Sequence, residues 1–366
     1  MRILLITDLP WGEEESAVEG LFRHELRAAH EVEVVFHAGG LWKADRRDGA
    51  IVLPKRALRH GLWRALAVET NPDGWDYVIV RNKFHVLRQA LRRRGRCKVG
   101  FWESFPHAYR RVEDAVIRRR GVWRKRLEFR LKKWVQLRML RRADFFLPIT
   151  RPHEEEFYPR LGVPSHPLPM GVDRGLWAGR KADRGEGPLR LVYTGTLDKL
   201  RGMELICRAV AGLEGDFVLD IYTFSGEALC EPIRQIGDSR IRVHRGLARS
   251  ELVQEIASAH VGICVLPELR TYQGSSPTKA VEYAALGIVP LVNPLPDYNS
   301  WLGEGCAVYT GFGLEPIRIA LGRMMARPRS ELLAMGEECA RRAWRHRDYR
   351  VLAAGLVEFL SGLGHE

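Results

Sequence analysis

The chain contains no Cys-x-x-Cys pair and no long apolar run. Its six cysteines lie far apart, which argues against a disulfide framework or a structural zinc site and favours reduced, mostly buried thiols. No stretch approaches the roughly 18 consecutive apolar residues that a membrane-spanning helix needs. The apolar run at residues 3–6 is too brief for a signal peptide, and no small-residue cleavage site follows it. These absences predict a cytoplasmic protein.

The positive charge is unevenly distributed. The net charge is +13, yet residues 81–142 alone carry 22 lysines and arginines against four acidic residues, so the remaining chain is slightly acidic. Such a block indicates an anionic partner, whether a phospholipid, a phosphate-bearing acceptor or a nucleic acid.

Residues 123–142 predict a long basic amphipathic helix inside this block. We expect its apolar stripe to pack inward while its cations attract lipid head groups or an acidic glycan. In the alternative, the cations merely face water. The stripe comprises Trp123, Leu127, Leu131, Trp134, Val135 and Leu140, and the cations are Arg118–Arg120, Arg124–Arg126, Lys132 and Lys133.

The length of 366 residues predicts two domains, and both halves alternate short apolar strands with helical stretches, as parallel α/β sheets do. A Gly- and Pro-rich stretch near 160–190 separates the halves. We expect an N-terminal domain over 1–168, a C-terminal domain over 169–345, and a helix over 346–366 that packs back on the first domain. Expected strands are 2–7, 32–36, 77–81, 98–102, 145–149, 189–194, 217–222, 241–244, 261–266 and 288–293, with the first helix at 17–29 and others near 202–213, 227–236, 249–259, 277–286 and 314–326.

The strongest local motif is Gly274–Gly287, which a strand follows. Ser276 suits the N-cap, Pro277 suits the first helical position, and Gly287 can adopt the left-handed conformation that ends a helix. The free amides and the dipole of such a helix form a site for phosphate.

Two charged side chains support the prediction of a nucleotide-binding site at this helix. Lys279 adds a positive charge within the first turn, and Glu282, three residues later on the same face, can accept hydrogen bonds from the paired hydroxyls of a ribose. A plain capped helix with both side chains solvated is the alternative.

A second motif, Leu191–Gly202, runs from a strand through a polar turn into a helix. Gly195 allows close approach of the backbone, and Lys199 and Arg201 can neutralise a pyrophosphate. An ordinary loop with surface cations is the alternative.

Together these motifs resemble the family of retaining glycosyltransferases with the GT-B fold, called group 1 or family 4. The resemblance covers nearly the whole chain and implies two facing Rossmann-like domains, of which the N-terminal one binds the acceptor and the C-terminal one binds the nucleotide-sugar. Pro169–Asp173 resembles the family's Pro-Asn-Gly-Val-Asp connection, Tyr193–Gly202 its donor loop, Val243–Gly246 and Ala257–Val261 its base-side loop and next strand, and Ser276–Gly287 the Ser-Pro-x-Lys-x-x-Glu-Tyr form of its acidic motif.

The resemblance implies that Glu282 binds the donor ribose, that Arg201, Lys279 and the first-turn amides hold the diphosphate, and that the sugar is transferred with retention. No Asp-x-Asp pair occurs, so fixed cations rather than a metal would stabilise the leaving group. The donor-binding residues assigned in this way are Gly12, Gly195, Thr196, Lys199, Arg201, Gly226, Arg245, Ser275, Ser276, Thr278, Lys279 and Glu282.

The chain departs from the family pattern at several positions. Gly274 stands where the family commonly has a first Glu, and Thr196 stands where it often has Arg. Trp102–Pro106 is similar to the family's His-Asp-x-x-Pro segment, with Trp in place of His. Glu103 can therefore orient the acceptor hydroxyl or take its proton, and His107 is a second candidate. The expected catalytic residues are Glu103, His107, Arg201 and Lys279.

The sequence thus predicts a hexosyl-type glycosyltransferase that acts in surface polysaccharide or glycoconjugate synthesis. Expected partners are a nucleotide-sugar, with UDP favoured over GDP, a saccharide or lipid-linked acceptor, and an anionic membrane surface that residues 110–142 contact, so the protein would be peripheral on the inner face of the cytoplasmic membrane. We expect no cofactor, no metal and no specific nucleic acid. An inactive nucleotide-sugar-binding homologue and a nucleic-acid-binding protein are the alternatives.

Overall fold

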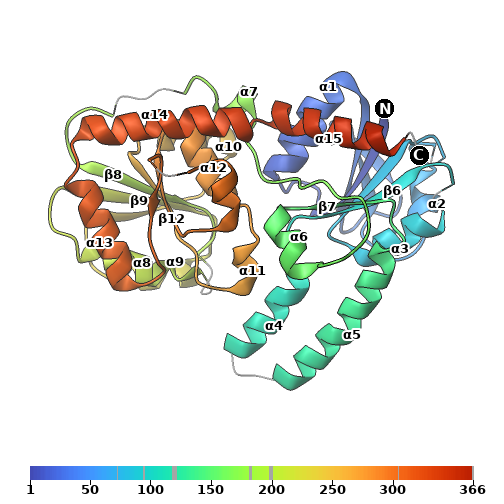
Figure 1. Cartoon of the computed structure of the whole chain (residues 1–366), viewed down its shortest axis with the longest axis horizontal. Helices are drawn as coiled ribbons and strands as arrows, with labels where there is room; N and C mark the ends of the chain where they lie inside the picture. Colours follow the sequence, from blue (N-terminus) through green and yellow to red (C-terminus); the bar gives the residue numbers. More distant parts are fainter. Residues whose placement is uncertain are drawn as a thin grey trace. The chain divides into compact units, whose positions relative to one another are not determined.

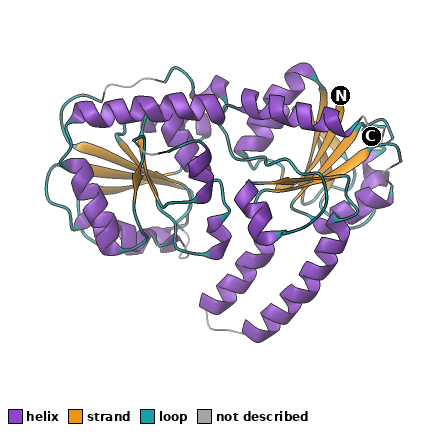
Figure 2. Ribbon diagram, viewed as in Figure 1, coloured by secondary structure: helices purple, strands orange, loops and turns teal. Residues whose placement is uncertain are grey.

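The computed structural model describes residues 1–71, 73–93, 95–117, 122–180, 184–197, 201–303 and 305–364 (Figures 1 and 2). The chain divides into two compact units. Unit 1 contains Met1–Pro169, Gly274–Ser276 and Tyr349–Glu366, and unit 2 contains Met170–Gln273 and Pro277–Asp348. Each unit is a parallel-dominated sheet covered by helices, so the prediction of two Rossmann-like α/β domains is confirmed.

Unit 1 is built on a seven-stranded sheet of order β3-β4-β2-β1-β5-β6-β7, parallel except for the pairing of β3 with β4. The strands are β1 (Arg2–Pro10), β2 (Glu31–Ala38), β3 (Asp45–Arg47), β4 (Ala50–Pro54), β5 (Tyr77–Arg81), β6 (Lys98–Glu103) and β7 (Phe145–Pro148). The helices are η1 (Val18–Leu26), α1 (Arg27–Ala29), α2 (Leu62–Leu66), α3 (Phe84–Arg92), α4 (His107–Ile117), α5 (Val122–Leu140), α6 (Arg151–Phe157) and α15 (Tyr349–Leu363). The five strands predicted here are confirmed, whereas β3 and β4 were not predicted.

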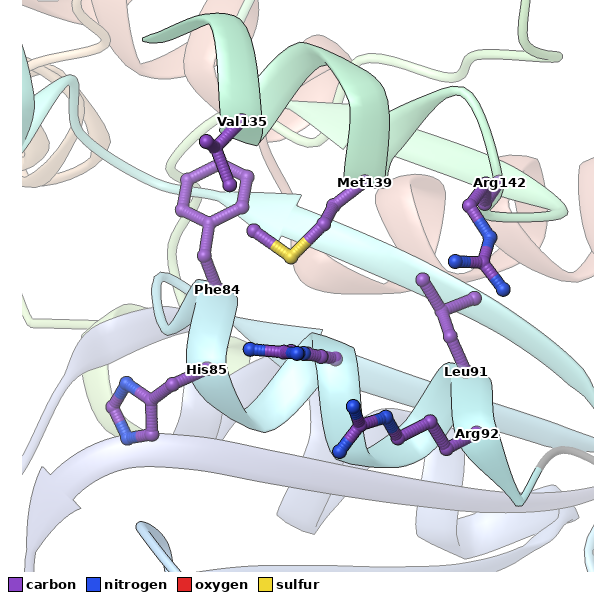
Figure 3. Close-up of a pocket in the computed structure, with 8 residues that line it drawn as sticks. Phe84, His85, Leu91, Arg92, Val135, Met139 and Arg142 are labelled. Carbon is purple, nitrogen blue, oxygen red and sulfur yellow. The ribbon is translucent and has the colours of Figure 1, made fainter. Parts of the chain in front are cut away.

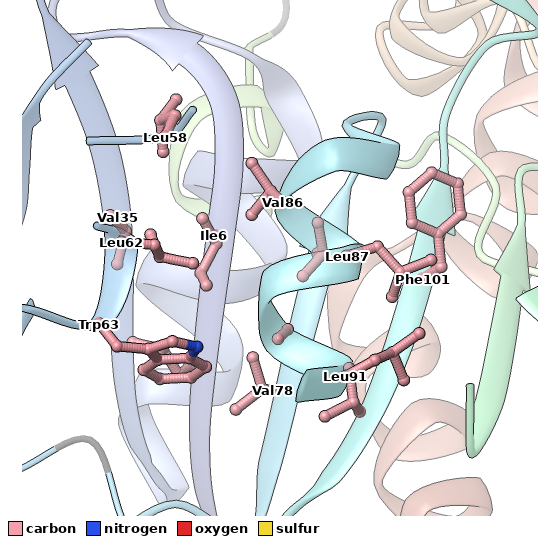
Figure 4. Close-up of a cluster of buried hydrophobic side chains, with 14 of the residues drawn as sticks. Ile6, Val35, Leu58, Leu62, Trp63, Val78, Val86, Leu87, Leu91 and Phe101 are labelled. Atoms are coloured by element: carbon pink, nitrogen blue, oxygen red, sulfur yellow. The ribbon is translucent and has the colours of Figure 1, made fainter. Parts of the chain in front are cut away.

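The core of unit 1 explains why these runs become strands. β5 and β4 are buried along their whole length, as expected for strands with helices on both faces. Apolar side chains from the central strands meet those of α2 and α3 in one cluster (Figure 4). Ile6, Val35 and Val78 come from the sheet, and Leu62 and Leu87 come from the covering helices.

The first helix spans the predicted residues, but η1 is wound as a wide π-type helix. Its apolar residues Leu21, Phe22 and Leu26 are all buried. α15 packs against η1 and returns the chain to unit 1, as predicted. The hydroxyl of Tyr349 bonds the hydroxyl of Ser16 at 2.9 Å. At the other end of the helix, the hydroxyl of Tyr77 in β5 donates to the carbonyl of Leu360 at 2.6 Å.

The basic helix α5 is present, but its orientation differs from the prediction. α4 and α5 pack together and extend away from the sheet of unit 1 (Figure 1). The predicted stripe faces solvent, because its members Trp123, Leu127, Leu131 and Trp134 are 72%, 63%, 68% and 59% exposed. Only Leu140, at the end of the stripe, is buried.

A second face of α5 makes the inward contacts. Phe129 packs its ring against that of Tyr109 from α4, with centroids 4.5 Å apart. Lys133, predicted to face lipid, is buried instead, with its ammonium 3.3 Å from the centroid of the Tyr158 ring. Aromatic partners on α4 and after α6 therefore decide which face of α5 turns inward. Of the other predicted outward cations, Arg118–Arg120 lie outside the described residues.

Unit 2 has an all-parallel sheet of order β10-β9-β8-β11-β12-β13. Its strands are β8 (Leu189–Thr194), β9 (Phe217–Thr223), β10 (Ile241–Arg245), β11 (Val261–Cys264), β12 (Val289–Val292) and β13 (Val308–Tyr309). Its helices are α7 (Arg174–Trp177), α8 (Met203–Ala211), α9 (Glu227–Arg234), α10 (Arg249–Ile256), α11 (Arg270–Gln273), α12 (Thr278–Ala285), η3 (Pro296–Ser300), α13 (Leu314–Met325) and α14 (Arg329–His346). Five strands and five helices match the predicted ranges, whereas β13, α7, α11, η3 and α14 were not predicted.

The chain leaves unit 2 at a buried ion pair. α14 extends as far as His346 and has Arg347 as its C-cap. The guanidinium of Arg347 donates to Asp297 at 2.7 Å and to Ser300 at 3.1 Å. Both charged side chains are only 4% exposed. Removing one partner would leave the other charge buried without compensation.

Two absences apply to the described part of the chain. None of its helices combines enough length and apolarity to cross a bilayer. The six cysteines are all free, and all but Cys97 are buried, as predicted.

The buried pair generates a stability prediction. Asp297→Ala should lower the free energy of unfolding of unit 2 by about 3–5 kcal/mol, because it leaves the charge of Arg347 buried without its partner. The matched control is Glu331→Ala, which removes an exposed pair with Arg327 and should cost less than about 1 kcal/mol. Urea unfolding followed by circular dichroism measures both changes, and equal midpoints for the two variants would contradict the prediction.

Candidate functional site

The sheet of unit 2 reverses its strand order beside β8. The chain passes from β8 to β9 and β10 on one side, then crosses to β11 and β12 on the other. Ligands of open parallel sheets bind outside the carboxyl ends of the strands at such a reversal. The predicted donor residues Gly195 and Thr196 directly follow β8 and therefore lie at this point.

Tyr283 fixes the geometry of the reversal. Its ring, fully buried, covers Gly262 of β11, where an added Cβ would lie 2.2 Å from a ring carbon. Its hydroxyl accepts a hydrogen bond at 2.9 Å from the backbone N–H of Thr194, at the end of β8. One side chain of α12 thus contacts both strands that border the reversal.

Lys279 lies across the loop that follows β8. A Cβ added to Gly195 would lie 2.7 Å from Cε and 2.9 Å from Nζ of Lys279, and Gly195 has a positive φ of 120°. The ammonium is also 4.7 Å from the centroid of the Tyr193 ring. A side chain at residue 195 would therefore displace the lysine, and the two predicted motifs meet through this contact.

Arg201 lies in the same neighbourhood. Burial raises the pKa of the Cys264 thiol at the end of β11, and the charges of Lys279 and Arg201 both act on it in the opposite direction. Two of the predicted catalytic cations are therefore near one strand end. The third predicted cation of this loop, Lys199, lies outside the described residues.

Glu282 is buried and carries an ion pair that sequence reasoning missed. Arg249, the first residue of α10, donates to its Oε1 at 2.7 Å. The two residues are separated by 33 positions, and no local pattern connects them. The pair fixes the orientation of the Glu282 carboxylate.

The helix with Lys279 and Glu282 begins one residue later than predicted. α12 starts at Thr278, with Pro277 rather than Ser276 at the N-cap. The difference arises because the backbone of Pro277 is extended, with φ −68° and ψ 114°. Gly287 adopts the left-handed conformation expected of it, with φ 72°. In this first turn the amide of Ala280 donates to the carbonyl of Pro277 at 3.2 Å.

The remaining predicted donor residues are distributed around this edge and in unit 1. Gly226 is the N-cap of α9, after β9, and Arg245 is exposed at the end of β10, two strands from β8. Ser275 and Ser276 are buried and belong to unit 1. Gly12 lies in the turn after β1, also in unit 1, with a positive φ of 93° and open space where a side chain would stand.

A cavity of about 460 Å³ opens beside the carboxyl ends of β11, β12 and β13. Glu268, Gln273 and Asn293 line it, and the amide of Asn293 accepts from the N–H of Leu266 at 2.5 Å. The sequence analysis missed these polar groups, although Glu268 and Gln273 follow one predicted strand and Asn293 ends another. Their side chains present hydrogen-bonding groups to this cavity.

Unit 1 has its own cavity, of about 510 Å³, at the carboxyl ends of β1, β5 and β6. We call it the acceptor cavity, after the ligand that the family resemblance implies for the N-terminal domain. The predicted catalytic residues Glu103 and His107 both line it, together with Asp8, Asn82, Lys83, Phe84, His85, Arg110, Val112, Lys125, Glu128, Phe129, Lys132 and Gln136. The sheet reverses its order between β1 and β5, so this cavity occupies the equivalent place in unit 1.

A strained residue stabilises the floor of the acceptor cavity. Asn82 has a left-handed backbone, with φ 55°, uncommon for any residue but glycine. Its amide bridges Asp8 at 3.3 Å and Ser104 at 2.9 Å. Arg81 donates to the same carboxylate of Asp8 at 2.5 Å. The ends of three strands are thereby tied together.

Glu103 is held from behind by two side chains that the sequence analysis did not identify. Nε2 of His153, which is fully buried, is 2.8 Å from Oε2 of Glu103. The hydroxyl of Tyr158 also bonds Glu103, and burial together with this carboxylate raises the pKa of Tyr158 well above its usual value. Glu103 is 5% exposed and faces the cavity from a fixed position.

His107 is more open than Glu103, at the start of α4. The walls of the cavity still desolvate its ring, which lowers its pKa from the usual value. A neutral imidazole at neutral pH can accept a proton. Two proton acceptors thus border one cavity. No group of three His, Cys, Asp or Glu side chains among the described residues is arranged to hold a metal ion.

The glycine at residue 274 has a structural reason. A Cβ added there would lie 2.7 Å from Cα of His153. The hydroxyl of Thr150 donates to the carbonyl of Gly274 at 2.7 Å. The family's Glu at this position would therefore collide with the backbone that carries the partner of Glu103.

This contact predicts an effect on stability. Gly274→Ala should destabilise the protein by about 1–3 kcal/mol, because the methyl group overpacks against backbone rather than a movable side chain. Gly226→Ala is the control, since its φ of −66° suits alanine and no atom lies within 4 Å of the new methyl group. Thermal unfolding of both variants tests this, and a Gly274→Ala protein as stable as Gly226→Ala would refute it.

No protein-family model and no curated protein sequence matches the chain. Solved structures match it over its full length. A sucrose-phosphate synthase from Thermosynechococcus elongatus has a TM-score of 0.76 at 12% identity, covering 100% of this chain and 99% of its own. A UDP-forming α,α-trehalose-phosphate synthase from Burkholderia vietnamiensis scores 0.68 at 17% identity, with both chains covered to 100%. Anabaena HepE in complex with UDP and glucose scores 0.72 at 11% identity, covering 99% and 100%. The chain therefore has the GT-B fold that the sequence predicted.

Proposed function

We propose that the protein transfers a hexosyl group from a nucleotide-sugar, UDP-linked in preference to GDP-linked, to a saccharide or lipid-linked acceptor. The observation that carries this proposal is the placement of Lys279 over Gly195 at the strand reversal of unit 2. The structural neighbours support UDP, since one is UDP-forming and another was solved with UDP and glucose.

The leaving nucleotide would be stabilised by fixed positive charge. The first-turn amides of α12, the ammonium of Lys279 and the guanidinium of Arg201 would surround the diphosphate, whose charge grows as the glycosidic bond breaks. Glu282, oriented by Arg249, would accept hydrogen bonds from the ribose. We propose that these fixed charges act without a metal ion.

The acceptor would bind in the acceptor cavity. Glu103, fixed by His153 and Tyr158, would orient the attacking hydroxyl or take its proton, with His107 as the second proton acceptor. Retention at the anomeric carbon, with the leaving phosphate assisting, follows from the family resemblance. Synthesis of a surface polysaccharide or glycoconjugate is the setting we propose. An inactive nucleotide-sugar-binding homologue is the competing interpretation.

Calorimetric titration with UDP and with GDP tests the donor site. We expect UDP to bind more tightly. Lys279→Met keeps the length of the side chain but removes its charge, so it should weaken UDP binding by about 1.5–3 kcal/mol, at least tenfold. The control Arg318→Met removes a cation that is 46% exposed on α13, and it should leave the affinity unchanged.

Two outcomes would count against the donor site. Failure of both nucleotides to bind would mean that the fold is retained without its chemistry. Equal UDP affinity of Lys279→Met and Arg318→Met would show that the nucleotide does not bind beside Lys279 of α12. Glu282→Gln is a useful third variant, because it keeps the shape of the side chain beside Arg249 and removes only the charge.

We also propose that the exposed face of α5 contacts an anionic membrane. Trp123, Leu127, Leu131 and Trp134 follow one another at helical spacing and are all exposed. Cations such as Arg124, Arg126, Arg130 and Arg138 flank them on the same helix. Apolar side chains at the interface and cations at the head groups are the two attractions that interfacial helices use. The protein would then act as a peripheral protein on the cytoplasmic face.

Vesicle sedimentation tests the membrane contact. The protein should bind phosphatidylglycerol vesicles more strongly than phosphatidylcholine vesicles, and less at high salt. Leu127→Asp combined with Leu131→Asp should reduce the bound fraction several-fold. The matched control is Val351→Asp with Ile319→Asp, which alters apolar residues of similar exposure on α15 and α13. Unchanged binding of the α5 variant would reject the contact, and binding to oligonucleotides alone would favour a nucleic-acid partner.

A further inference from the structure

A groove of about 430 Å³ runs between α3 and α5 in unit 1 (Figure 3). Its lining is apolar apart from His85 and three arginines. The lining residues are Phe84, His85, Arg88, Leu91, Arg92, Val135, Met139 and Arg142.

The groove has two different ends. Phe84, Val135 and Met139 point toward one another at one end, and Leu91, Arg92 and Arg142 gather at the other (Figure 3). The spacing explains the arrangement, because Phe84, Arg88 and Arg92 recur every four residues along α3 and face the row Val135, Met139 and Arg142. The stems of the arginines extend the apolar wall while their heads reach water.

The apolar end of the groove adjoins the acceptor cavity. Phe84 and His85 line both hollows. A ligand whose polar end lies near Glu103 and His107 can therefore continue past Phe84 into the groove without leaving the protein surface.

The acceptor cavity supplies a cation at this junction. Lys125 and Lys132 both pair with Glu128, and their hydrogen bonds lower the pKa of that carboxyl to about 2. Lys83, at the N-cap of α3 and next to Phe84, pairs with no carboxylate of the described residues. Its ammonium is available to an anionic ligand at the point where the cavity opens into the groove.

We infer that the α3–α5 groove binds the hydrocarbon chain of a phosphate-linked lipid acceptor, whose phosphate pairs with Lys83 and whose reactive hydroxyl lies in the acceptor cavity. This inference rests on the proposed transferase function and selects a lipid-linked acceptor over a free saccharide. The free energy of binding a hydrocarbon chain in an apolar groove grows with the apolar area removed from water. A free saccharide has no such chain and would leave the groove empty.

The occupant is a single acceptor lipid rather than a bilayer lipid that anchors the protein. Charge decides the orientation. An anchoring lipid would place its head group at Arg92 and Arg142, at the far end, whereas an acceptor places its phosphate at Lys83, beside the catalytic candidates. The two orientations depend on different cations and can be separated.

Dodecyl phosphate below its micelle concentration is the probe, with binding measured by calorimetry on the full chain. We expect it to bind more tightly than inorganic phosphate or dodecyl maltoside, because neither of these offers both a chain and an anionic head. Each methylene removed from the chain should weaken binding by up to about fourfold. Equal affinity for dodecyl phosphate and inorganic phosphate would overturn the inference.

Two variants on one helix locate the chain. Val135→Glu places a charge in the groove at a residue that is 43% exposed, so it should fold normally and weaken dodecyl phosphate binding at least tenfold. Leu131→Glu makes the same change one turn earlier, outside both hollows, and should leave the affinity within about twofold. Val135→Trp fills the groove without adding charge and should also prevent binding. Equal affinity of the Val135 and Leu131 variants would overturn the inference.

A second pair fixes the orientation and separates this inference from the transferase proposal. Lys83→Met should weaken dodecyl phosphate binding at least tenfold while Arg142→Met has little effect, and the reverse result would indicate an anchoring lipid and overturn the inference. UDP affinity should be unchanged in all these variants. UDP binding without dodecyl phosphate binding would reject the groove alone, whereas dodecyl phosphate binding without UDP binding would reject the proposed function.

Discussion

The packing of one tyrosine on one glycine determines the geometry of unit 2. Because Gly262 has no side chain, the ring of Tyr283 can pack directly on β11, and its hydroxyl reaches the end of β8. This fixes the start of α12 relative to both strands. The position of Lys279 over Gly195, and the nearness of Arg201 to the same strand end, depend on that docking. The cationic site is therefore a product of core packing rather than of loop flexibility.

Unit 1 reaches an equivalent result with polar contacts. Asp8, Arg81, Asn82 and Ser104 connect the ends of three strands through hydrogen bonds, and one of these residues has a strained backbone. Such strain persists only where the surroundings enforce it. Each unit thus fixes the strand ends at the reversal of its strand order, but the main support is an aromatic ring packed on glycine in unit 2 and a set of polar contacts in unit 1.

The sequence predicted most strands and the elements that carry the motifs, because their apolar runs are long enough to show a period. β4 (Ala50–Pro54) was missed because it ends in a proline, a residue that argues against a strand inside a sheet, and α14 was missed because charged residues interrupt its apolar positions. The predicted side chains lie at the carboxyl ends of strands, as expected. Their supports could not be predicted, because Arg249 meets Glu282 across 33 positions and His153 meets Glu103 across 50.

The exposed stripe of α5 affects how readily the purified protein associates with itself in solution. The surplus of positive charge around the stripe makes separate molecules repel one another, and this repulsion keeps the apolar residues of different molecules apart. Added salt shortens the range of the repulsion to about 3 Å at 1 M but does not weaken the attraction between apolar surfaces. Colloidal stability should therefore fall as ionic strength rises, the opposite of the behaviour of a protein held in aggregates by charge.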